Sequence, residues 1–168
     1  MPVLAWPDVA IPALPGDPRP LRLYDTSTKE LRPTAIGETA RMFVCGITPY
    51  DATHLGHAST YLAFDLINRR WRDVGAHVVY VQNVTDIDDP LLERAAATGA
   101  DWQDLATDQI QLFRDDMTAL RVLPPSDLVG VVDSIDEVAV RVKDLIDAGA
   151  AYRVDDDWYF DVTSDPRF

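Results

Sequence analysis

Residues 42–84, MFVCGITPYDATHLGHASTYLAFDLINRRWRDVGAHVVYVQNV, decide the fold of this 168-residue chain. The apolar stretch 42–45 is typical of a short strand, and 77–84 is typical of a strand buried on both faces. Apolar residues recur between them at helical spacing: Leu62, Ala63, Leu66, Ile67, Trp71 and Val74. A strand, helix and strand within about forty residues predict a parallel unit with a right-handed crossover, and therefore an α/β fold.

The sequence on either side of this unit predicts further elements. Residues 1–20 are typical of an extended, Pro-rich arm without a core of its own, and two short strands should follow at 21–25 and 29–32. Asp89 predicts an N-cap and Gly99 the end of one helix, Asp101 caps the next, and Ser134 with Glu137 predicts a capping box for a fourth. The third and fourth helices have these apolar stripes: Ala106, Ile110, Phe113, Met117 and Leu120; Ile135, Val138, Val142 and Leu145. Residues 151–154 and 158–162 predict a hairpin.

Composition limits the classes of protein that this chain can belong to. Apolar residues make up 47% of it, enough for a core, and its formal net charge is −13. Such a charge repels nucleic acid and favours cationic ligands. One cysteine excludes an internal disulfide, and the Pro-interrupted N-terminus resembles neither a signal peptide nor a membrane span. We therefore expect a cytoplasmic, monomeric protein that binds small molecules, with no nucleic acid and no membrane as partner.

The connection between the first strand and its helix is long. It spans residues 46–56, whereas such connections usually have about 2–6 residues. It lies at the carboxyl end of a parallel strand, where open α/β sheets bind ligands, and it ends in His54-Leu55-Gly56-His57 at a helix N-terminus. That terminus attracts phosphate, and two imidazoles can donate hydrogen bonds to phosphate oxygens. On the tetrapeptide alone, a surface histidine pair or a metal site is the alternative.

The motifs around this connection carry a family resemblance. His54-Leu55-Gly56-His57 resembles the "HIGH" signature of the class I aminoacyl-tRNA synthetases. The wider set resembles cysteinyl-tRNA synthetase over about residues 21–162: Cys45-Gly46, Tyr50-Asp51, Ala58, Phe64-Asp65 and the run from Asn83 to Asp89. Ile47 and Pro49 depart from that enzyme's CGPTVYD pattern, and Ser59 departs from its HIGHAR pattern. With the Pro-rich arm, these departures resemble the related mycothiol ligase family.

The resemblance implies a fold and a division into domains. It implies the N-terminal half of a Rossmann-like, parallel-sheet nucleotide-binding domain of the class I synthetase (HUP) type, over residues 21–123. The arm, 1–20, precedes it, and residues 124–168 would begin an inserted α+β connective subdomain. The family's lysine loop and its remaining zinc ligands are not found in this sequence. We therefore expect an N-terminal fragment that is inactive by itself.

The resemblance also implies a reaction. An ATP-dependent ligase, using magnesium and one zinc ion, would form cysteinyl adenylate from L-cysteine and transfer the cysteinyl group to the amine of glucosaminyl-inositol, releasing AMP and pyrophosphate. His54 and His57 would be catalytic, and Cys45 would bind zinc, which accepts the substrate thiolate. ATP or the adenylate would be bound by Cys45, Gly46, Ile47, Thr48, Gly56, Thr60, Asn83, Val84 and Thr85.

Several of these assignments have simpler alternatives. Cys45 could be a small buried residue, Thr60 could bond its own helix backbone, and Asn83 and Thr85 could satisfy loop backbone. The acidic residues Asp86, Asp88 and Asp89 could serve magnesium or the substrate ammonium, or only cap a helix. Two other functions stay open: a cysteinyl-tRNA synthetase, and a non-catalytic nucleotide-binding fragment.

Overall fold

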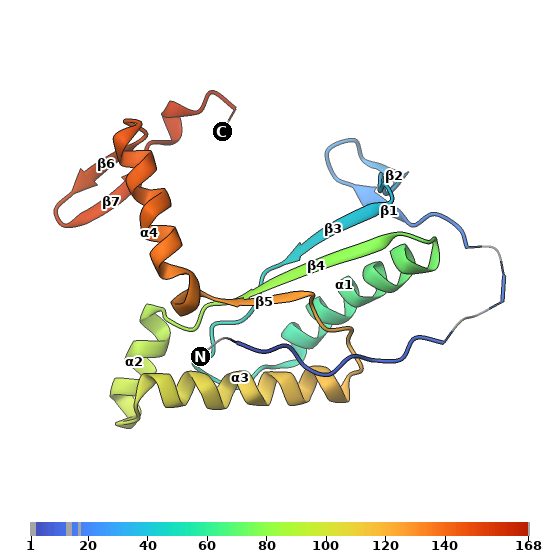
Figure 1. Ribbon diagram of the computed structural model, residues 1–168, viewed down its shortest axis with the longest axis horizontal. Coiled ribbons are helices and arrows are strands. Elements are labelled where there is room, and N and C mark those ends of the chain that lie inside the picture. Colours follow the sequence, from blue (N-terminus) through green and yellow to red (C-terminus); the bar gives the residue numbers. More distant parts are fainter. Residues whose placement is uncertain (1–2, 13–14, 17, 168) are drawn as a thin grey trace. The chain divides into compact units, whose positions relative to one another are not determined.

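The computed structural model describes residues 3–12, 15–16 and 18–167, and it divides into two compact units, Met1–Val131 and Val132–Phe168. In chain order, the strands are β1 (Arg22–Asp25), β2 (Glu30–Pro33), β3 (Thr39–Val44), β4 (His77–Val84), β5 (Asp127–Gly130), β6 (Ala151–Val154) and β7 (Asp157–Phe160). The helices are α1 (Leu55–Asp73), α2 (Asp89–Thr98), α3 (Trp102–Ala119), α4 (Val131–Asp147) and the 3₁₀ turn η1 (Val162–Ser164) (Figure 1).

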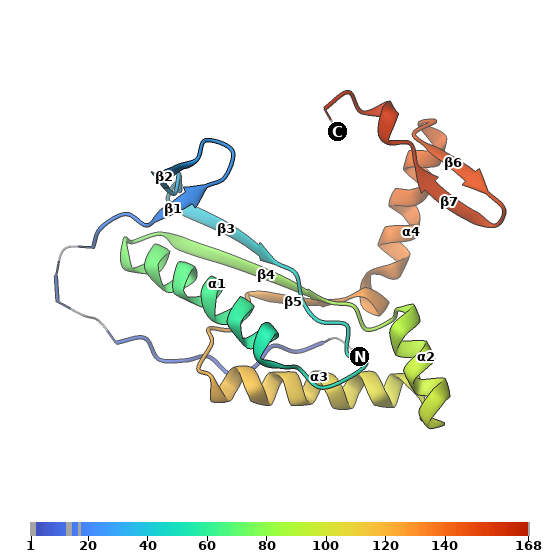
Figure 2. The same cartoon turned by 180° about the vertical axis from the view of Figure 1, so that it is seen from behind.

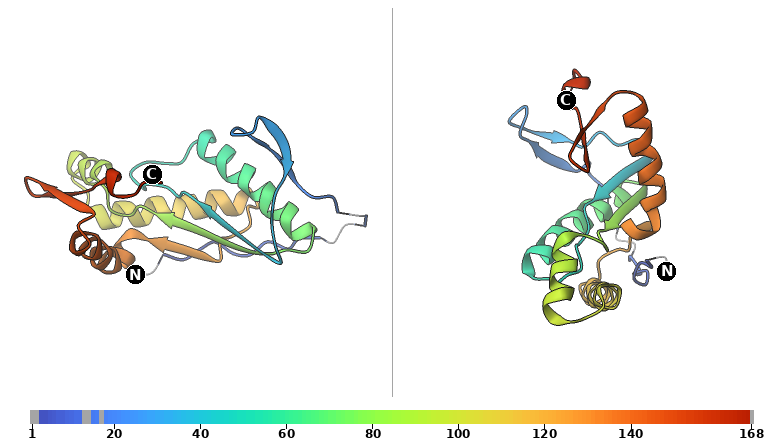
Figure 3. Two further views of the ribbon diagram at one scale, coloured as in Figure 1. Left: turned by 90° about the horizontal axis from the view of Figure 1, so that it is seen from above. Right: turned by 90° about the vertical axis from the view of Figure 1, so that its left-hand side faces the viewer.

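The centre of the first unit is a parallel sheet in the order β3-β4-β5. Met42 pairs with Tyr80 and Gln82 with Leu128, so the predicted parallel strand–helix–strand unit and the α/β class are confirmed. β5 was not predicted. Helices α1 and α3 lie on the same side of the sheet (Figures 1 and 3). The prediction that residues 77–84 are buried on both faces is wrong, because alternate residues are only half-buried and Phe43 on β3 is 64% exposed.

Helix α1 buries the predicted face only in part, since Leu62, Ile67 and Trp71 are partly buried against the core. Its fully buried residues are Tyr61, Asp65 and Asn68, whereas Ala63 and Leu66 are exposed. The Asp65 carboxylate accepts hydrogen bonds from the Leu123 amide at 2.8 Å and from Arg69 Nε at 2.7 Å. Because these partners satisfy the carboxylate, a charged residue can occupy the core-facing side of the helix.

Residues 3–12 of the N-terminal arm contribute Trp6 to the core of the first unit, a contact that the expectation of an extended arm without its own core did not include. Trp6 is 3% exposed, its Nε1 donates to the Val122 carbonyl at 2.8 Å, and its ring meets Phe113 edge-on with centroids 5.5 Å apart. Arg114 on α3 donates to the carbonyl of Ala5 at 3.2 Å. Residues 3–12 therefore run along α3 (Figures 1 and 2).

Two helix starts differ from their predictions. Asp88, not Asp89, is the N-cap of α2, and its side chain accepts from the Asp89 amide at 2.9 Å, while Gly99 ends the helix in the left-handed conformation as expected. Helix α4 already begins at Val131, so Ser134 lies within its first turns and does not start it. Asp101 caps α3 as predicted.

The second unit contains most of α4 and the predicted hairpin, formed by β6 and β7 with Tyr152 paired to Tyr159. The apolar stripe of α4, from Ile135 to Leu145, is exposed. The boundary between the two units falls in the sequence between residues 131 and 132. Residues 124–131, which include strand β5 of the sheet, therefore belong to the first unit. The domain division that we expected at residue 124 stays a prediction. Within the described part of the chain, no helix is both long and apolar enough to cross a membrane.

Candidate nucleotide site at the carboxyl edge of the sheet

The carboxyl ends of β3 and β4 are joined by the first residues of the long connection. The Gly46 amide donates to Asn83 Oδ1 at 2.9 Å, and the Thr85 amide donates to the Ile47 carbonyl at 2.9 Å. A Cβ at Gly46 would lie 1.5 Å from the Asn83 carbonyl oxygen, so only glycine fits. The structure thus brings the predicted residues of 45–48 and 83–85 together at one edge of the sheet, where parallel sheets bind ligands.

Not all of these residues can offer a side chain to a ligand. Ile47 and Val84 are buried, so they present only backbone there. The Asn83 side chain is used by the loop, because its Oδ1 accepts from Gly46 and its Nδ2 donates to Thr85 Oγ1 at 3.3 Å. Thr48 is half-buried, and its carbonyl accepts from the Tyr50 amide at 2.9 Å in a tight turn. Adenylate binding by these residues stays a prediction.

The two histidines form a reciprocal cap at the start of α1. His54 is the N-cap, and its Nδ1 accepts from the Gly56 amide at 3.0 Å, while His57 Nδ1 accepts from the His54 amide at 3.2 Å. The two rings lie 4.2 Å apart between centroids. A nitrogen that accepts a hydrogen bond carries no proton, so this network assigns the proton of each neutral ring to Nε2. Both Nε2–H groups are thus available to donate to an anion.

Electrostatics favours the neutral form of His57. Partial burial, and next the neighbouring His54, lower the pKa of His57 below its ordinary value of 6.5. A neutral His57 can keep its Nδ1 as the acceptor that the cap requires. His57 would therefore meet a ligand as a neutral donor, beside backbone N–H groups at the positive end of the helix dipole.

Gly56 and Thr60 have structural tasks in the first turn of α1. A Cβ at Gly56 would lie 2.7 Å from Cε1 of His54, so the glycine makes room for the capping imidazole. Thr60 Oγ1 donates to the Gly56 carbonyl at 3.2 Å, which is the simpler alternative for this hydroxyl. Contact of either residue with ATP stays a prediction.

Cys45 is exposed at the end of β3, which excludes the alternative of a small buried residue. The Tyr61 hydroxyl lies 3.4 Å from the Cys45 carbonyl, and burial raises the pKa of Tyr61 to about 12, so this hydroxyl stays a donor. Among the described residues, no group of three or more His, Cys, Asp or Glu could hold a metal. The chain therefore offers one soft sulfur donor, which fits zinc only as part of a larger ligand set.

The sequence did not predict the contacts by which α3 supports the candidate site. Thr53 Oγ1 donates to Asp116 Oδ2 of α3 at 2.6 Å, and the Tyr61 ring packs on Phe113 with centroids 5.1 Å apart. The partners of the Thr53 bond are 63 residues apart in the sequence. No local pattern marks such a pair, although the Phe113 stripe did indicate a helix with a buried face.

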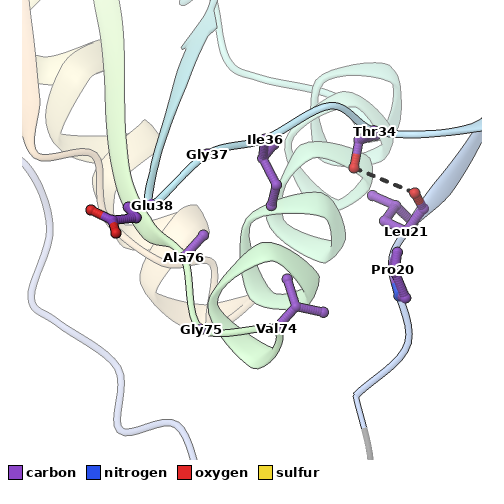
Figure 4. A pocket seen from close by; sticks show the side chains of 9 residues that line it. All are labelled: Pro20, Leu21, Thr34, Ile36, Gly37, Glu38, Val74, Gly75 and Ala76. Atoms are coloured by element: carbon purple, nitrogen blue, oxygen red, sulfur yellow. Dashed lines mark hydrogen bonds between the residues drawn. The ribbon is translucent and has the colours of Figure 1, made fainter.

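A hollow of about 390 Å³ lies elsewhere, at the amino ends of β3 and β4 (Figure 4). Its lining is Pro20, Leu21, Thr34, Ile36, Gly37, Glu38, Val74, Gly75 and Ala76. Glu38 is the one ionisable residue among these nine, and parallel sheets bind ligands at the opposite edge. The hollow therefore lies at the opposite edge of the sheet from the candidate site at residues 45–57.

Comparison with known proteins places this geometry in a family. Residues 32–168 match the sequence model of the tRNA synthetases class I (C) catalytic domain. A protein of Nakamurella multipartita, named L-cysteine:1D-myo-inositol 2-amino-2-deoxy-alpha-D-glucopyranoside ligase, is 62% identical over 98% of this chain and 42% of its own length. A protein of the same name from Saccharomonospora viridis is 63% identical over 97% of this chain and 39% of its own length.

The chain thus spans about 40% of the length of these curated relatives. Among solved structures, Mycobacterium tuberculosis methionyl-tRNA synthetase bound by methionyl-adenylate has the same fold. Its TM-score is 0.59 at 24% identity, over 67% of this chain and 23% of that one. The family match covers most of the chain, and the capped histidine pair and the parallel sheet lie within it. The chain belongs to the class I (C) tRNA synthetase catalytic domain family.

Proposed function

We propose that the whole protein containing this chain is an ATP-dependent ligase that joins L-cysteine to the amine of glucosaminyl-inositol. Two relatives that are 62% and 63% identical to the chain have a name that specifies these two substrates. The observation that carries the nucleotide part is the reciprocal cap, which leaves Nε2–H of His54 and His57 as donors at the N-terminus of α1.

The chemistry needs no nucleophile from the protein. A carboxylate oxygen of cysteine attacks the α-phosphorus of ATP, and the bond to pyrophosphate breaks, with the electron pair leaving on pyrophosphate. The amine nitrogen of the amino sugar then attacks the cysteinyl carbonyl carbon, loses a proton and expels AMP. The imidazole N–H groups and the helix start would stabilise the charge that builds on phosphate oxygens in the first step.

We further propose that Cys45 is a zinc ligand and that magnesium accompanies ATP. Zinc bound there would select cysteine over serine, because a thiolate is a far better zinc ligand than a hydroxyl. The exposed thiol at the end of β3, next to the backbone of residues 46–48, supports this placement. The chain contributes one donor to that ligand set, and the net charge of −13 suits a cationic amino sugar.

Cysteine-dependent ATP–pyrophosphate exchange tests the first step. The assay would use a chimaera in which this chain replaces the corresponding part of the Nakamurella multipartita relative. We expect exchange with L-cysteine at least about 100-fold more efficient than with L-serine, because the site that binds the thiolate leaves its ligand position unfilled with serine. Exchange that does not depend on cysteine would contradict the proposal.

A further inference from the structure

The hydrogen bond between Thr53 and Asp116 links the connection to a rigid helix. Thr53 directly precedes the N-cap His54, and both members of the bond are half-buried. The donor is a hydroxyl and the acceptor a carboxylate, 2.6 Å apart, which is the short geometry of a charge-assisted bond. The bond therefore acts on the residue next to the histidine cap. Figure 2 shows the connection passing beside α3 on its way to α1.

Asp116 is held in place by the packing of α3. Phe113 and Met117, its neighbours on the buried face, are almost fully inaccessible, and Phe113 contacts both Trp6 and Tyr61. Side chains packed in this way keep a single rotamer and fix the backbone that carries Asp116. The carboxylate is thus a fixed point, set by α3 and not by the connection itself.

The neighbouring residues of the connection are held much less firmly. Residues 50–52 and 54–56 are exposed. Asp51 lies 4.0 Å from Arg94 with both side chains at least half-exposed, and such surface pairs contribute little. Within the described chain, the bond to Asp116 is therefore the firmest side-chain tether that joins this end of the connection to another helix.

We propose that Asp116 is a positioning residue, which fixes Thr53 and through it the orientation of His54 and His57. Without the bond, the start of α1 would sample several cap geometries, and the two Nε2–H groups would no longer point together. The expected change in the geometry of the histidine cap follows from the structure alone. The effect on rate rests on the proposed function.

Imidazole nitrogen NMR of this chain tests the structural half. The chain has three histidines, and His77 lies at the opposite end of β4, so it serves as an internal control. In wild type, His54 and His57 should give the nitrogen shifts of a fixed Nε2–H tautomer. Asp116→Ala should move both toward tautomer-averaged shifts, whereas Asp116→Asn, whose amide oxygen can accept the same bond, should not.

Two further variants keep this test decisive. Asp115→Ala removes the neighbouring carboxylate of α3, which accepts a hydrogen bond from Gln111 Nε2 on the same helix at 2.8 Å, and it should leave all three histidines unchanged. Thr53→Val removes the donor side of the bond at nearly constant volume, and it should reproduce Asp116→Ala. If His54 and His57 keep their wild-type shifts in a folded Asp116→Ala or Thr53→Val protein, the inference is wrong.

Kinetics of the chimaera tests the second half. Asp116→Ala should lower kcat for ATP–pyrophosphate exchange about 10- to 100-fold while KM for cysteine changes by less than about twofold, as expected when positioning of transition-state donors is lost. Asp116→Asn should recover most of kcat. A merely structural role would reduce only the folded fraction, with kcat per active site unchanged. An inactive wild-type chimaera would instead defeat the proposed function and leave the NMR result standing.

Discussion

The amide nitrogen of Gly46 and the side-chain oxygen of Asn83 lie 2.9 Å apart and join the carboxyl ends of β3 and β4. At the same place, a Cβ on Gly46 would come within 1.5 Å of the backbone carbonyl oxygen of Asn83. The two strands therefore approach too closely for any side chain at residue 46. The geometry of the carboxyl edge of the sheet, where we propose that ATP binds, depends on this close approach.

Gly46→Ala should consequently displace the backbone at the site. We expect the free energy of unfolding to fall by at least about 1–3 kcal/mol, because a clash of the new Cβ with backbone atoms cannot be relieved by a rotamer change. Urea denaturation measures this, and ATP titration should show weaker binding. Gly37→Ala is the matched control, since a Cβ there meets nothing within 4 Å. Equal stability of the two variants would contradict the account.

Trp6→Ala should show that the arm belongs to the core. Removing this side chain, which is buried and bonded to the Val122 carbonyl, should cost about 3–5 kcal/mol of unfolding free energy. Leu4→Ala in the same arm removes a 65% exposed side chain and should change stability by less than about 0.5 kcal/mol. Denaturant unfolding of both variants gives the comparison. A Trp6→Ala protein as stable as Leu4→Ala would show that the arm is dispensable.

The histidine cap should make stability depend on pH. The pKa of His57 in the folded chain lies below its ordinary value of 6.5, so the neutral form is favoured by folding. The resulting stability is fully present above pH 6.5 and is lost as the pH falls through the lower, folded-state pKa. His57→Gln, whose amide oxygen can accept the His54 amide without titrating, should lack this loss. Parallel pH profiles of unfolding free energy for the two proteins would refute the assignment.

Cys45→Ser should remove bound zinc from the chimaera. We expect the metal content, measured by elemental mass spectrometry, to fall by about one zinc per chain, because a serine hydroxyl replaces a thiolate ligand poorly. His77→Ala is the control, since His77 is exposed at the other end of β4. Unchanged zinc in Cys45→Ser, or equal loss in both variants, would exclude Cys45 as a ligand.

Periodicity and glycine signals predicted the elements that position the site. Strand β4 has the bounds predicted for residues 77–84, and α1 starts within the His54–His57 motif, because strands and helix caps are encoded locally. Periodicity indicated the partly buried Leu62, Ile67 and Trp71 of α1 but not its buried polar residues Asp65 and Asn68. Asp65 can be buried only because the Leu123 amide, 58 residues away, satisfies it.

The other misses also concern distant partners or short segments. The Trp6 side chain donates to the carbonyl of Val122, which is 116 residues away in the sequence. Because the Pro-rich arm has no apolar periodicity of its own, its sequence did not indicate that Trp6 is a core residue. Strand β5 has four residues, too few for an alternation to stand out after Pro124 and Pro125. The histidine motif was visible in the sequence, but its reciprocal hydrogen bonds and the tether to Asp116 follow from tertiary structure alone.

The choice of acceptor tests the central claim most directly. The chimaera would be given L-cysteine, ATP and magnesium with either glucosaminyl-inositol or tRNA, and the products would be separated by mass spectrometry. We predict the cysteinyl amide of the amino sugar, formed together with AMP and pyrophosphate, and no aminoacylated tRNA. Cysteinyl-tRNA formed in the absence of any amide product would contradict the ligase assignment and identify a cysteinyl-tRNA synthetase instead.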